Sequence, residues 1–254
     1  MGFQENSKRK YIPWYEAEGN NYSQEAWQEC LYAMEQLSLL KINHFERFKS
    51  LEDAKYIYEQ RQKLDSKTID KDKALTVAMY PCIDKNNAFS AQWNTLPDII
   101  ARPAQQLLYF EITGDADLKS ALNLLKTNLP DGQELTLILT GHGNKDLLQW
   151  DSGTVDYYLD PTDYTDQKFT GLLHGLDITL VIFDSCKAGY GGNAEENQAN
   201  RFAGHIRPGG KVIAPVIDIY RVNYLFNADD GIQGVTYNTG DPAILYQVEG
   251  RFPP

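Results

Sequence analysis

The stretch Ile178-Thr179-Leu180-Val181-Ile182-Phe183-Asp184-Ser185-Cys186-Lys187-Ala188-Gly189 decides the fold. Its first six residues are rich in β-branched and large apolar side chains, and the run is shorter than a typical helix. Such runs are typical of strands that are buried on both faces of a parallel sheet. The strand ends at a cysteine, and open α/β sheets bind ligands at the carboxyl ends of their strands. The sequence therefore predicts that Cys186 lies at a functional edge.

A second apolar run, Leu135–Thr140, ends in the same manner at Gly141-His142-Gly143. The interval between His142 and Cys186 is long enough for one strand, a returning helix and the next strand. If the two strands are parallel neighbours, the imidazole and the thiol face one cleft.

The remaining segments alternate between strand and helix patterns. Further strands are predicted over 74–80, 107–112, 211–217 and 243–248, and helices over 118–128, 169–175 and 194–206. This alternation predicts an α/β fold with a mostly parallel sheet and helices on both faces. Residues 1–73 are predicted to form an N-terminal helical accessory region, with helices starting at Ser23 and over 42–64 and a charged linker over 65–73. Residues 74–254 are predicted to form the main domain.

Composition excludes several classes of function. The net charge of −11 argues against nucleic acid as a partner, because phosphate binding depends on Lys and Arg. Apolar runs are too short for a membrane span, and the first residues lack the apolar core of a signal peptide. The cysteines Cys30, Cys82 and Cys186 have neither metal-binding nor disulfide spacing, so we expect reduced thiols and a cytoplasmic location.

The pairing of Cys186 with His142 points to nucleophilic catalysis. A thiol attacks as its thiolate, and histidine exchanges protons near neutral pH. A tetrahedral intermediate also needs backbone N–H donors, for which Gly143 and the amide of Cys186 are the candidates. A side chain at position 143 is expected to crowd an incoming carbonyl group, which favours glycine there. The alternative is that Cys186 is a small core residue at a strand end.

These motifs resemble the caspase-like cysteine peptidases. The two motifs occur in the order found in that family. An apolar strand is followed by Gly141-His142-Gly143, and a later apolar strand is followed by Asp184-Ser185-Cys186. The wording is closest to metacaspases, whose pattern is Asp-Ser-Cys-His-Ser-Gly, although Lys187 and Ala188 replace its second His and Ser. The segment 158–163 is also similar to metacaspases. The resemblance covers roughly residues 74–220.

The resemblance implies a caspase-like fold in which Cys186 is the nucleophile and His142 the acid and base. It also implies that Asp184 lines the primary substrate pocket, which favours Arg or Lys before the cut. Asp218, after the predicted strand 211–217, is a second candidate for that pocket. Arg221 is the alternative, because caspases use an arginine pocket to bind aspartate.

A calcium requirement is common among metacaspases, and the acidic stretch 146–166 is the candidate site here. A solvated acidic loop is the alternative interpretation, and we otherwise predict no metal and no cofactor. Cys82 and the histidines His44, His174 and His205 are expected to be structural or surface residues. The glycine-rich segment 189–193 lacks the Lys-Ser/Thr of a phosphate-binding loop and is interpreted as a flexible loop beside the substrate.

The sequence thus predicts a cysteine endopeptidase with a Cys186–His142 dyad that acts on a protein or peptide after a basic residue. Two alternatives remain open. One is a non-catalytic caspase-like interaction module in which residues 1–73 bind a partner. The other is an effector that uses the same dyad for self-cleavage or acyl transfer on one dedicated target.

Overall fold

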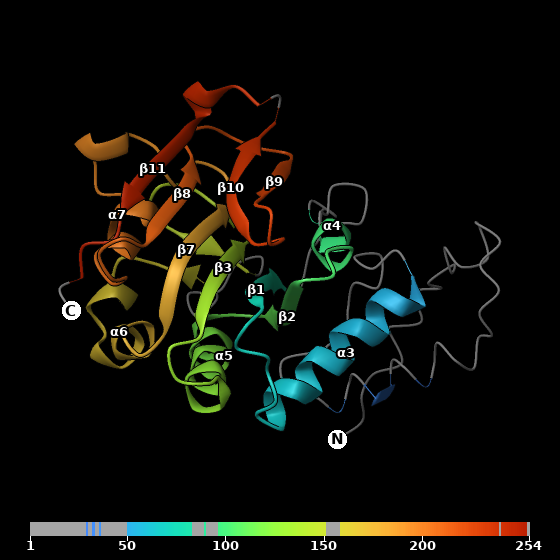
Figure 1. Ribbon diagram of the computed structural model, residues 1–254. Coiled ribbons are helices and arrows are strands. Elements are labelled where there is room, and N and C mark those ends of the chain that lie inside the picture. The colour runs from blue at the N-terminus through green and yellow to red at the C-terminus, as the bar shows by residue number, and fades with distance from the viewer. Residues whose placement is uncertain are drawn as a thin grey trace, which may run out of the picture.

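A computed structural model describes residues 29, 32–33, 36, 50–82, 89, 96–150, 158–238 and 240–252 of the chain. Within these residues, a six-stranded sheet with the order β11-β8-β7-β3-β1-β2 forms the centre of the molecule (Figure 1). The predicted α/β class is therefore confirmed. Several predicted features lie outside the described residues, namely the helix from Ser23, residues 42–49 of the second helix, Cys30, His44 and residues 151–157.

The sheet is parallel apart from one edge. The strands β1 (Ala74–Pro81), β2 (Gln105–Ile112), β3 (Glu134–Thr140), β7 (Asp177–Asp184) and β8 (Lys211–Pro215) run in one direction, and β11 (Leu245–Glu249) pairs antiparallel with β8. Strands β3 and β7 are direct neighbours, with Thr140 opposite Asp184. His142 and Cys186 therefore follow adjacent, parallel strands, as the two apolar runs predict.

Three helices cover one face of the sheet (Figure 1). They are α5 (Asp115–Asn128), α6 (Gln167–Leu173) and α7 (Gln198–Ala203). Their inward side chains, including Leu122, Phe169 and Phe202, pack with Leu137 and Phe183 of β3 and β7 in one buried cluster. Each fully buried side chain of this size contributes about 1.5–3 kcal/mol to folding, so this layer holds β3 and β7 firmly in place.

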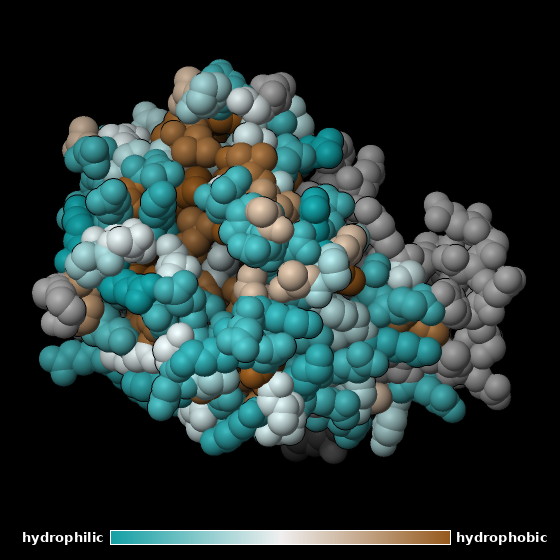
Figure 2. All heavy atoms as spheres, viewed as in Figure 1, coloured by the Kyte–Doolittle hydropathy of each residue, from teal (hydrophilic) through white to brown (hydrophobic). Residues whose placement is uncertain are grey.

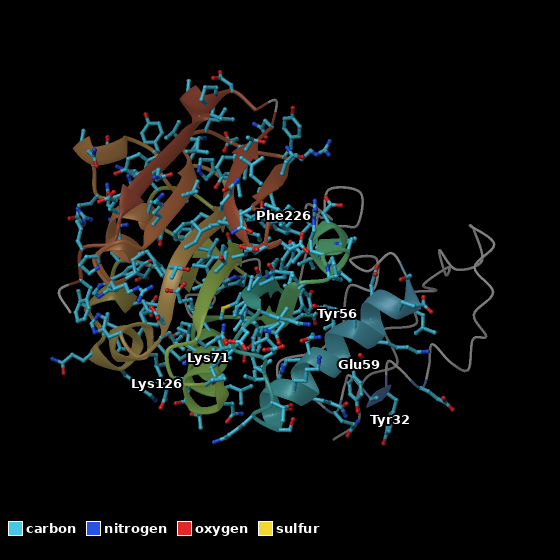
Figure 3. The ribbon with its side chains drawn as sticks, viewed as in Figure 1. Tyr32, Tyr56, Glu59, Lys71, Lys126 and Phe226 are labelled. Carbon is cyan, nitrogen blue, oxygen red and sulfur yellow. The ribbon has the colours of Figure 1, made fainter. Side chains whose placement is uncertain are left out.

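The other face is covered by α3 (Leu51–Asp65), α4 (Leu96–Ile100) and a hairpin of β9 (Val222–Phe226) and β10 (Ile232–Tyr237). Helix α3 begins at a capping box in which Ser50 accepts from Asp53 and Asp53 accepts from Ser50. Its Tyr56 donates a hydrogen bond to the carbonyl of Gln105 at 2.9 Å, at the start of β2 (Figure 3). Residues 51–65 of the predicted accessory region thus pack onto the sheet.

Two local features differ from the prediction. Between β3 and α6, where no strand is predicted, the chain forms a small sheet of β4 (His142–Gly143), β5 (Leu148–Gln149) and β6 (Tyr158–Leu159). The helix predicted over 194–206 is shorter, because Asn197 caps α7 by accepting from the amide of Asn200 at 2.9 Å. Short 3-10 turns occupy Asp163–Thr165, Gly192–Ala194 and Pro242–Ile244. Two-residue strands are too short to give a periodic pattern, which explains the first difference.

The surface seen in Figure 2 is mostly hydrophilic, and hydrophobic atoms gather in one band over the region of β8, β10 and β11. Partly buried side chains that pack against the core there include Ile244, Leu245, Tyr246 and Val248. Among the described residues, none of the helices combines the length and the apolar character that a membrane crossing requires.

Candidate active site

A cavity of about 280 Å³ opens beyond the carboxyl ends of β1, β3 and β7. Its walls are Tyr80, Phe89, Gly141, His142, Asp184, Ser185, Cys186, Ile219, Tyr220, Arg221 and Val222. The structure thus brings the imidazole of His142 and the thiol of Cys186 to one cavity. Open α/β sheets bind their ligands at this edge, so the position of the cavity is typical of a ligand-binding or catalytic site.

The Cys186 sulfur is held by the chain that follows β8. The amide of Ile219 donates to Sγ at 3.4 Å, and the thiol donates to the Ile219 carbonyl at 3.6 Å. Burial raises the pKa of the Cys186 thiol above its ordinary value. The hydrogen bond from Ile219 partly offsets that rise, and the carboxylates of Asp218 and Asp184 add to it. The site therefore favours a neutral thiol until a base removes the proton.

We expect iodoacetamide to modify Cys186 slowly at pH 7 and increasingly fast as the pH rises, because only the thiolate reacts. Asp218→Asn removes one carboxylate that raises the thiol pKa, so alkylation at pH 7 should become several-fold faster. The rate is measured by mass spectrometry of the Cys186 peptide. Asp229→Asn, in the exposed turn between β9 and β10, is the matched control. Equal rates for wild type and Asp218→Asn would contradict this electrostatic account.

His142 opens the small sheet and packs against an aromatic ring. The ring centroids of His142 and Phe89 are 5.1 Å apart, with the planes tilted by 56°. Below it, the indole of Trp150 is buried and donates to the carbonyl of Thr140 at 3.1 Å. Strand β5 pairs with β4, placing Gln149 opposite His142. The imidazole is thus carried by a short hairpin, residues 142–149, that is anchored to the end of β3.

Gly143 lies in β4, and a side chain there is excluded by the protein itself. A Cβ atom at this position would lie 2.7 Å from the carbonyl oxygen of Leu147 and closer still to the Ser185 hydroxyl. Glycine is therefore required because the hairpin packs against the Ser185 side chain. The crowding that the sequence suggested for a substrate carbonyl occurs here within the chain.

Asp184 is the titratable acid of the cavity. Burial raises the pKa of its carboxyl group to about 7, and the hydrogen bond from Thr140 Oγ1 at 3.4 Å works against that rise. Desolvation favours the neutral acid when no cation is near. At neutral pH the free cavity therefore holds Asp184 partly protonated, and a bound cation is expected to ionise it.

The other two charged candidates, Asp218 and Arg221, differ in whether they line the cavity. Asp218 is 67% exposed, pairs with Lys187 Nζ at 2.7 Å and is absent from the cavity walls. Lys187 takes this position with a positive φ of 55°, an uncommon conformation for a residue with a side chain. Arg221 lines the cavity, and among the described residues its guanidinium has no ion-pair partner.

Five of the eleven residues that line the cavity are not among those that the sequence singles out. Tyr80 lies one residue before the end of β1, so its place near a strand end is a signal for this edge, whereas Ile219, Tyr220 and Val222 follow β8 without a recognisable pattern. The sequence assigns Ser185 no role beyond its place in the Asp184-Ser185-Cys186 motif. Its side chain is buried, and its hydroxyl has no hydrogen-bond partner in the described part of the chain.

Two acids of the stretch 146–166, Asp163 and Asp166, are paired with a lysine of helix α5. Lys119 Nζ lies 3.0 Å from Asp115, 3.5 Å from Asp163 and 3.0 Å from Asp166. In the regions that the structure describes, no group of three His, Cys, Asp or Glu residues is arranged to hold a metal ion. These carboxylates therefore already have a cation, the ammonium group of Lys119.

The described residues His174, His205 and Cys82 are not among those that line the cavity. His174 Nε2 lies 3.2 Å from His205 Nδ1, and His174 stacks on Phe252 with ring centroids 3.5 Å apart. Burial lowers the pKa of both imidazoles, so both favour the neutral form. Cys82 is a buried cysteine directly after β1. The histidine pair packs the chain end against α6 and α7.

Neither the search of protein-family models nor the search of curated proteins found a match to this chain.

Proposed function

We propose that this protein is a cysteine endopeptidase in which Cys186 is the nucleophile and His142 the acid and base. The observation that supports this most directly is that both side chains line one cavity at the carboxyl ends of adjacent parallel strands. A nucleophile and a base in one cleft are the minimum for covalent acyl transfer. The resemblance of the two motifs to metacaspases points to the same chemistry.

In the proposed reaction, the Cys186 sulfur attacks the scissile carbonyl carbon while its proton passes to His142. The carbonyl electron pair moves to oxygen, and collapse of this intermediate breaks the C–N bond as His142 protonates the leaving amine. Water then attacks the thioester, giving its proton to His142, and the thiol leaves with that proton. The raised pKa of Cys186 means that the proton transfer accompanies attack.

The oxyanion of the intermediate needs backbone donors. Within the described residues, the amide N–H of Cys186 donates no hydrogen bond, so it is available to a substrate oxygen. We propose this amide as one donor and the amide of Gly143, in the facing hairpin, as the second. Fixed donors of this kind typically contribute about 3–4 kcal/mol to transition-state stabilisation.

For specificity, we propose that Asp184 binds an Arg or Lys side chain before the cut. It is the carboxyl group on the cavity wall, whereas Asp218 pairs with Lys187 outside it. Arg221 supports the alternative, because its guanidinium lines the same wall without an ion-pair partner among the described residues and suits an acidic side chain. The two proposals assign opposite charges to the same substrate position.

One observation favours a second candidate function. The Cys186 sulfur is engaged by Ile219 and its thiol pKa is raised, as expected of an unreactive cysteine. This supports a non-catalytic interaction module as the alternative.

A free thiol nucleophile also needs reducing surroundings, so we propose a cytoplasmic location for the peptidase.

The function is tested with a panel of fluorogenic peptides that differ only in the residue before the cut. We expect Arg and Lys peptides to be cleaved, Asp peptides to resist, and prior alkylation of Cys186 to stop cleavage. Each assay is run with calcium and with a chelator. Cleavage of Asp peptides alone would favour Arg221, and a reactive Cys186 that cleaves none of the peptides would favour an effector with one dedicated target.

A further inference from the structure

The start of helix α7 forms hydrogen bonds to the segment that carries His142 and to the segment that follows Cys186. The amide of Gln198 donates to the carbonyl of Lys145 at 2.9 Å, and the amide of Ala199 donates to the carbonyl of Ala188 at 3.2 Å. Lys145 belongs to the hairpin that begins at His142, and Ala188 lies two residues after Cys186. Consecutive amides of one helical turn thus join the segments that hold the two reactive groups.

The Gln198 side chain strengthens the connection to the hairpin. It is 0% exposed, and its Nε2 donates to the carbonyls of Asp146 at 2.6 Å and Leu159 at 3.1 Å. Its Oε1 accepts from the hydroxyl of Tyr164 at 2.6 Å. Both N–H donors of the Gln198 amide therefore bond to the chain of the small sheet, one to the turn between β4 and β5 and the other to β6. A buried amide with all these partners has one orientation and fixes the backbone that it touches.

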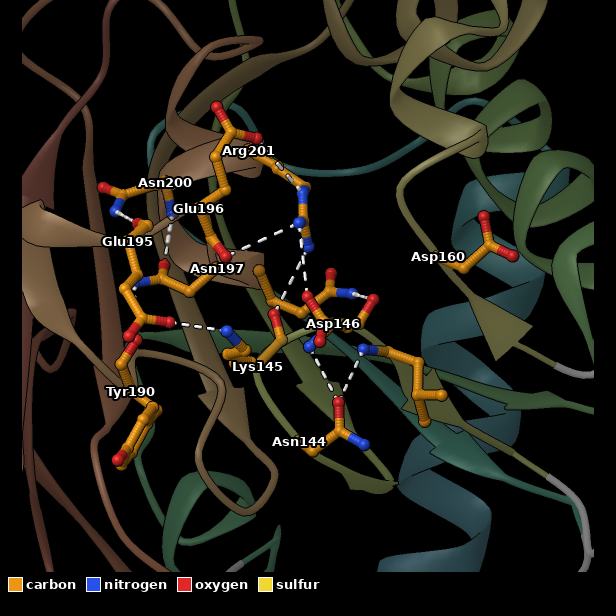
Figure 4. Close-up of polar contacts among 12 residues, drawn as sticks. Asn144, Lys145, Asp146, Asp160, Tyr190, Glu195, Glu196, Asn197, Asn200 and Arg201 are labelled. Carbon is orange, nitrogen blue, oxygen red and sulfur yellow. Dashed lines mark hydrogen bonds and ion pairs between the residues drawn. The ribbon is translucent and has the colours of Figure 1, made fainter.

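Charged side chains near the start of α7 add further contacts, and Figure 4 shows Lys145 pointing toward Glu195 and Arg201 pointing toward Asp146. Lys145 pairs with Glu195 at 2.5 Å, which joins the hairpin to the loop after Cys186 a second time. Arg201 of α7 donates to the carbonyl of Lys145 at 3.3 Å and pairs with Asp146 at 3.3 Å. An exposed ion pair such as Lys145–Glu195 contributes little stability by itself. The buried Gln198 is therefore the main element of the connection.

We propose that Gln198 is a positioning residue that holds the His142 hairpin, residues 142–149, in register with the loop that follows Cys186. Its effect on peptide cleavage rests on the proposed function, whereas its effect on the coupling of His142 to the Cys186 thiol does not. Catalysis by a dyad requires a fixed distance between base and nucleophile, and a displacement near 1 Å can cost about a hundredfold in rate.

The test compares Gln198→Met with Tyr164→Phe in the full chain. Methionine has a similar length but cannot donate to Asp146 or Leu159, whereas Tyr164→Phe removes the third bond of the same amide and spares both. We expect Gln198→Met to lower kcat about tenfold to a hundredfold with KM nearly unchanged. Tyr164→Phe should keep the wild-type kcat. Both are assayed well below their Tm.

The second measurement is the pH profile of Cys186 alkylation, with His142→Ala as the reference that lacks the imidazole. We expect the profile of Gln198→Met to move toward that of His142→Ala, and the profile of Tyr164→Phe to stay with wild type. If Gln198→Met does not fold, Gln198→Asn, which is one methylene shorter and still polar, takes its place with the same expected results.

A variant of Gln198 that loses Tm but keeps kcat and the wild-type alkylation profile would overturn the positioning role. A shift in alkylation without any peptide cleavage by wild type would support positioning while refuting the peptidase. A wild-type profile identical to that of His142→Ala would refute the dyad and this role with it.

Discussion

Cys186→Ala is expected to lower peptide cleavage by at least about a thousandfold while leaving the fold intact. The sulfur is the one atom of the proposed site that forms a covalent bond to substrate, and alanine has no replacement for it. The site tolerates the change structurally, since Cys186 is only partly buried and its hydrogen bonds to Ile219 are weak sulfur contacts. Cleavage is measured on the best Arg or Lys peptide, and folding by circular dichroism and Tm.

The matched control is Cys82→Ala, which removes the other cysteine side chain that the structure describes. Cys82 is buried at the end of β1 and is absent from the cavity walls, so its loss should affect stability more than rate. Residual cleavage in Cys186→Ala at the wild-type rate would end the peptidase proposal. Loss of activity in both variants, with a large fall in Tm, would point to misfolding.

Asp184→Asn is expected to remove the preference for basic peptides. Loss of one partner of a buried charge pair costs about 2–5 kcal/mol, which is about thirtyfold to several thousandfold in kcat/KM. In wild type, kcat/KM for Arg peptides should also rise between pH 6 and pH 8, because burial raises the pKa of Asp184 to about 7 and only the carboxylate attracts the cation. The Asn variant should lack that part of the pH dependence.

The same substitution has an opposite effect on stability. The pKa of Asp184 is higher in the folded protein than its ordinary value of 3.8, so the folded state favours the protonated acid. Its contribution to stability is complete below about pH 4 and is lost as the pH rises through about 7. Asn cannot ionise, so Asp184→Asn should be more stable than wild type at pH 8 by up to about 4 kcal/mol. Thermal unfolding at pH 5 and pH 8 measures this.

Asp218→Asn is the control for Asp184, because that carboxylate pairs with Lys187 outside the cavity. It should preserve the choice of basic peptides. If Asp218→Asn, and not Asp184→Asn, abolished cleavage after Arg, the assignment of the primary pocket would be wrong. Conversion of Asp184→Asn to an enzyme that cleaves after Asp would identify Arg221 as a competing determinant.

The sequence was sufficient for the central sheet because its signal is local. Buried parallel strands are continuous apolar runs, and Leu135–Thr140 and Ile178–Phe183 are both of this kind. The rule that ligands bind at the carboxyl ends of such strands then placed His142 and Cys186 at one edge. Strands β4, β5 and β6 escaped prediction because two residues are too few to give a periodic pattern.

Gln198 shows the limit of sequence reasoning most clearly. A glutamine in a polar helix start has the pattern of an exposed residue, yet its side chain is fully buried against Asp146 and Leu159. Neither partner is near it in the chain, so no local pattern could reveal the contact.

The sequence by itself determined which groups can react, since a thiol and an imidazole follow two apolar runs. Only the tertiary structure decided which charges face them. Asp184 lines the cavity, Asp218 pairs with Lys187 and is not among the lining residues, and Arg221 joins the wall from the segment after β8. The physical reason is that a strand end is fixed by local apolar pattern, whereas the surroundings of a charged side chain depend on segments that meet it only when the whole chain folds.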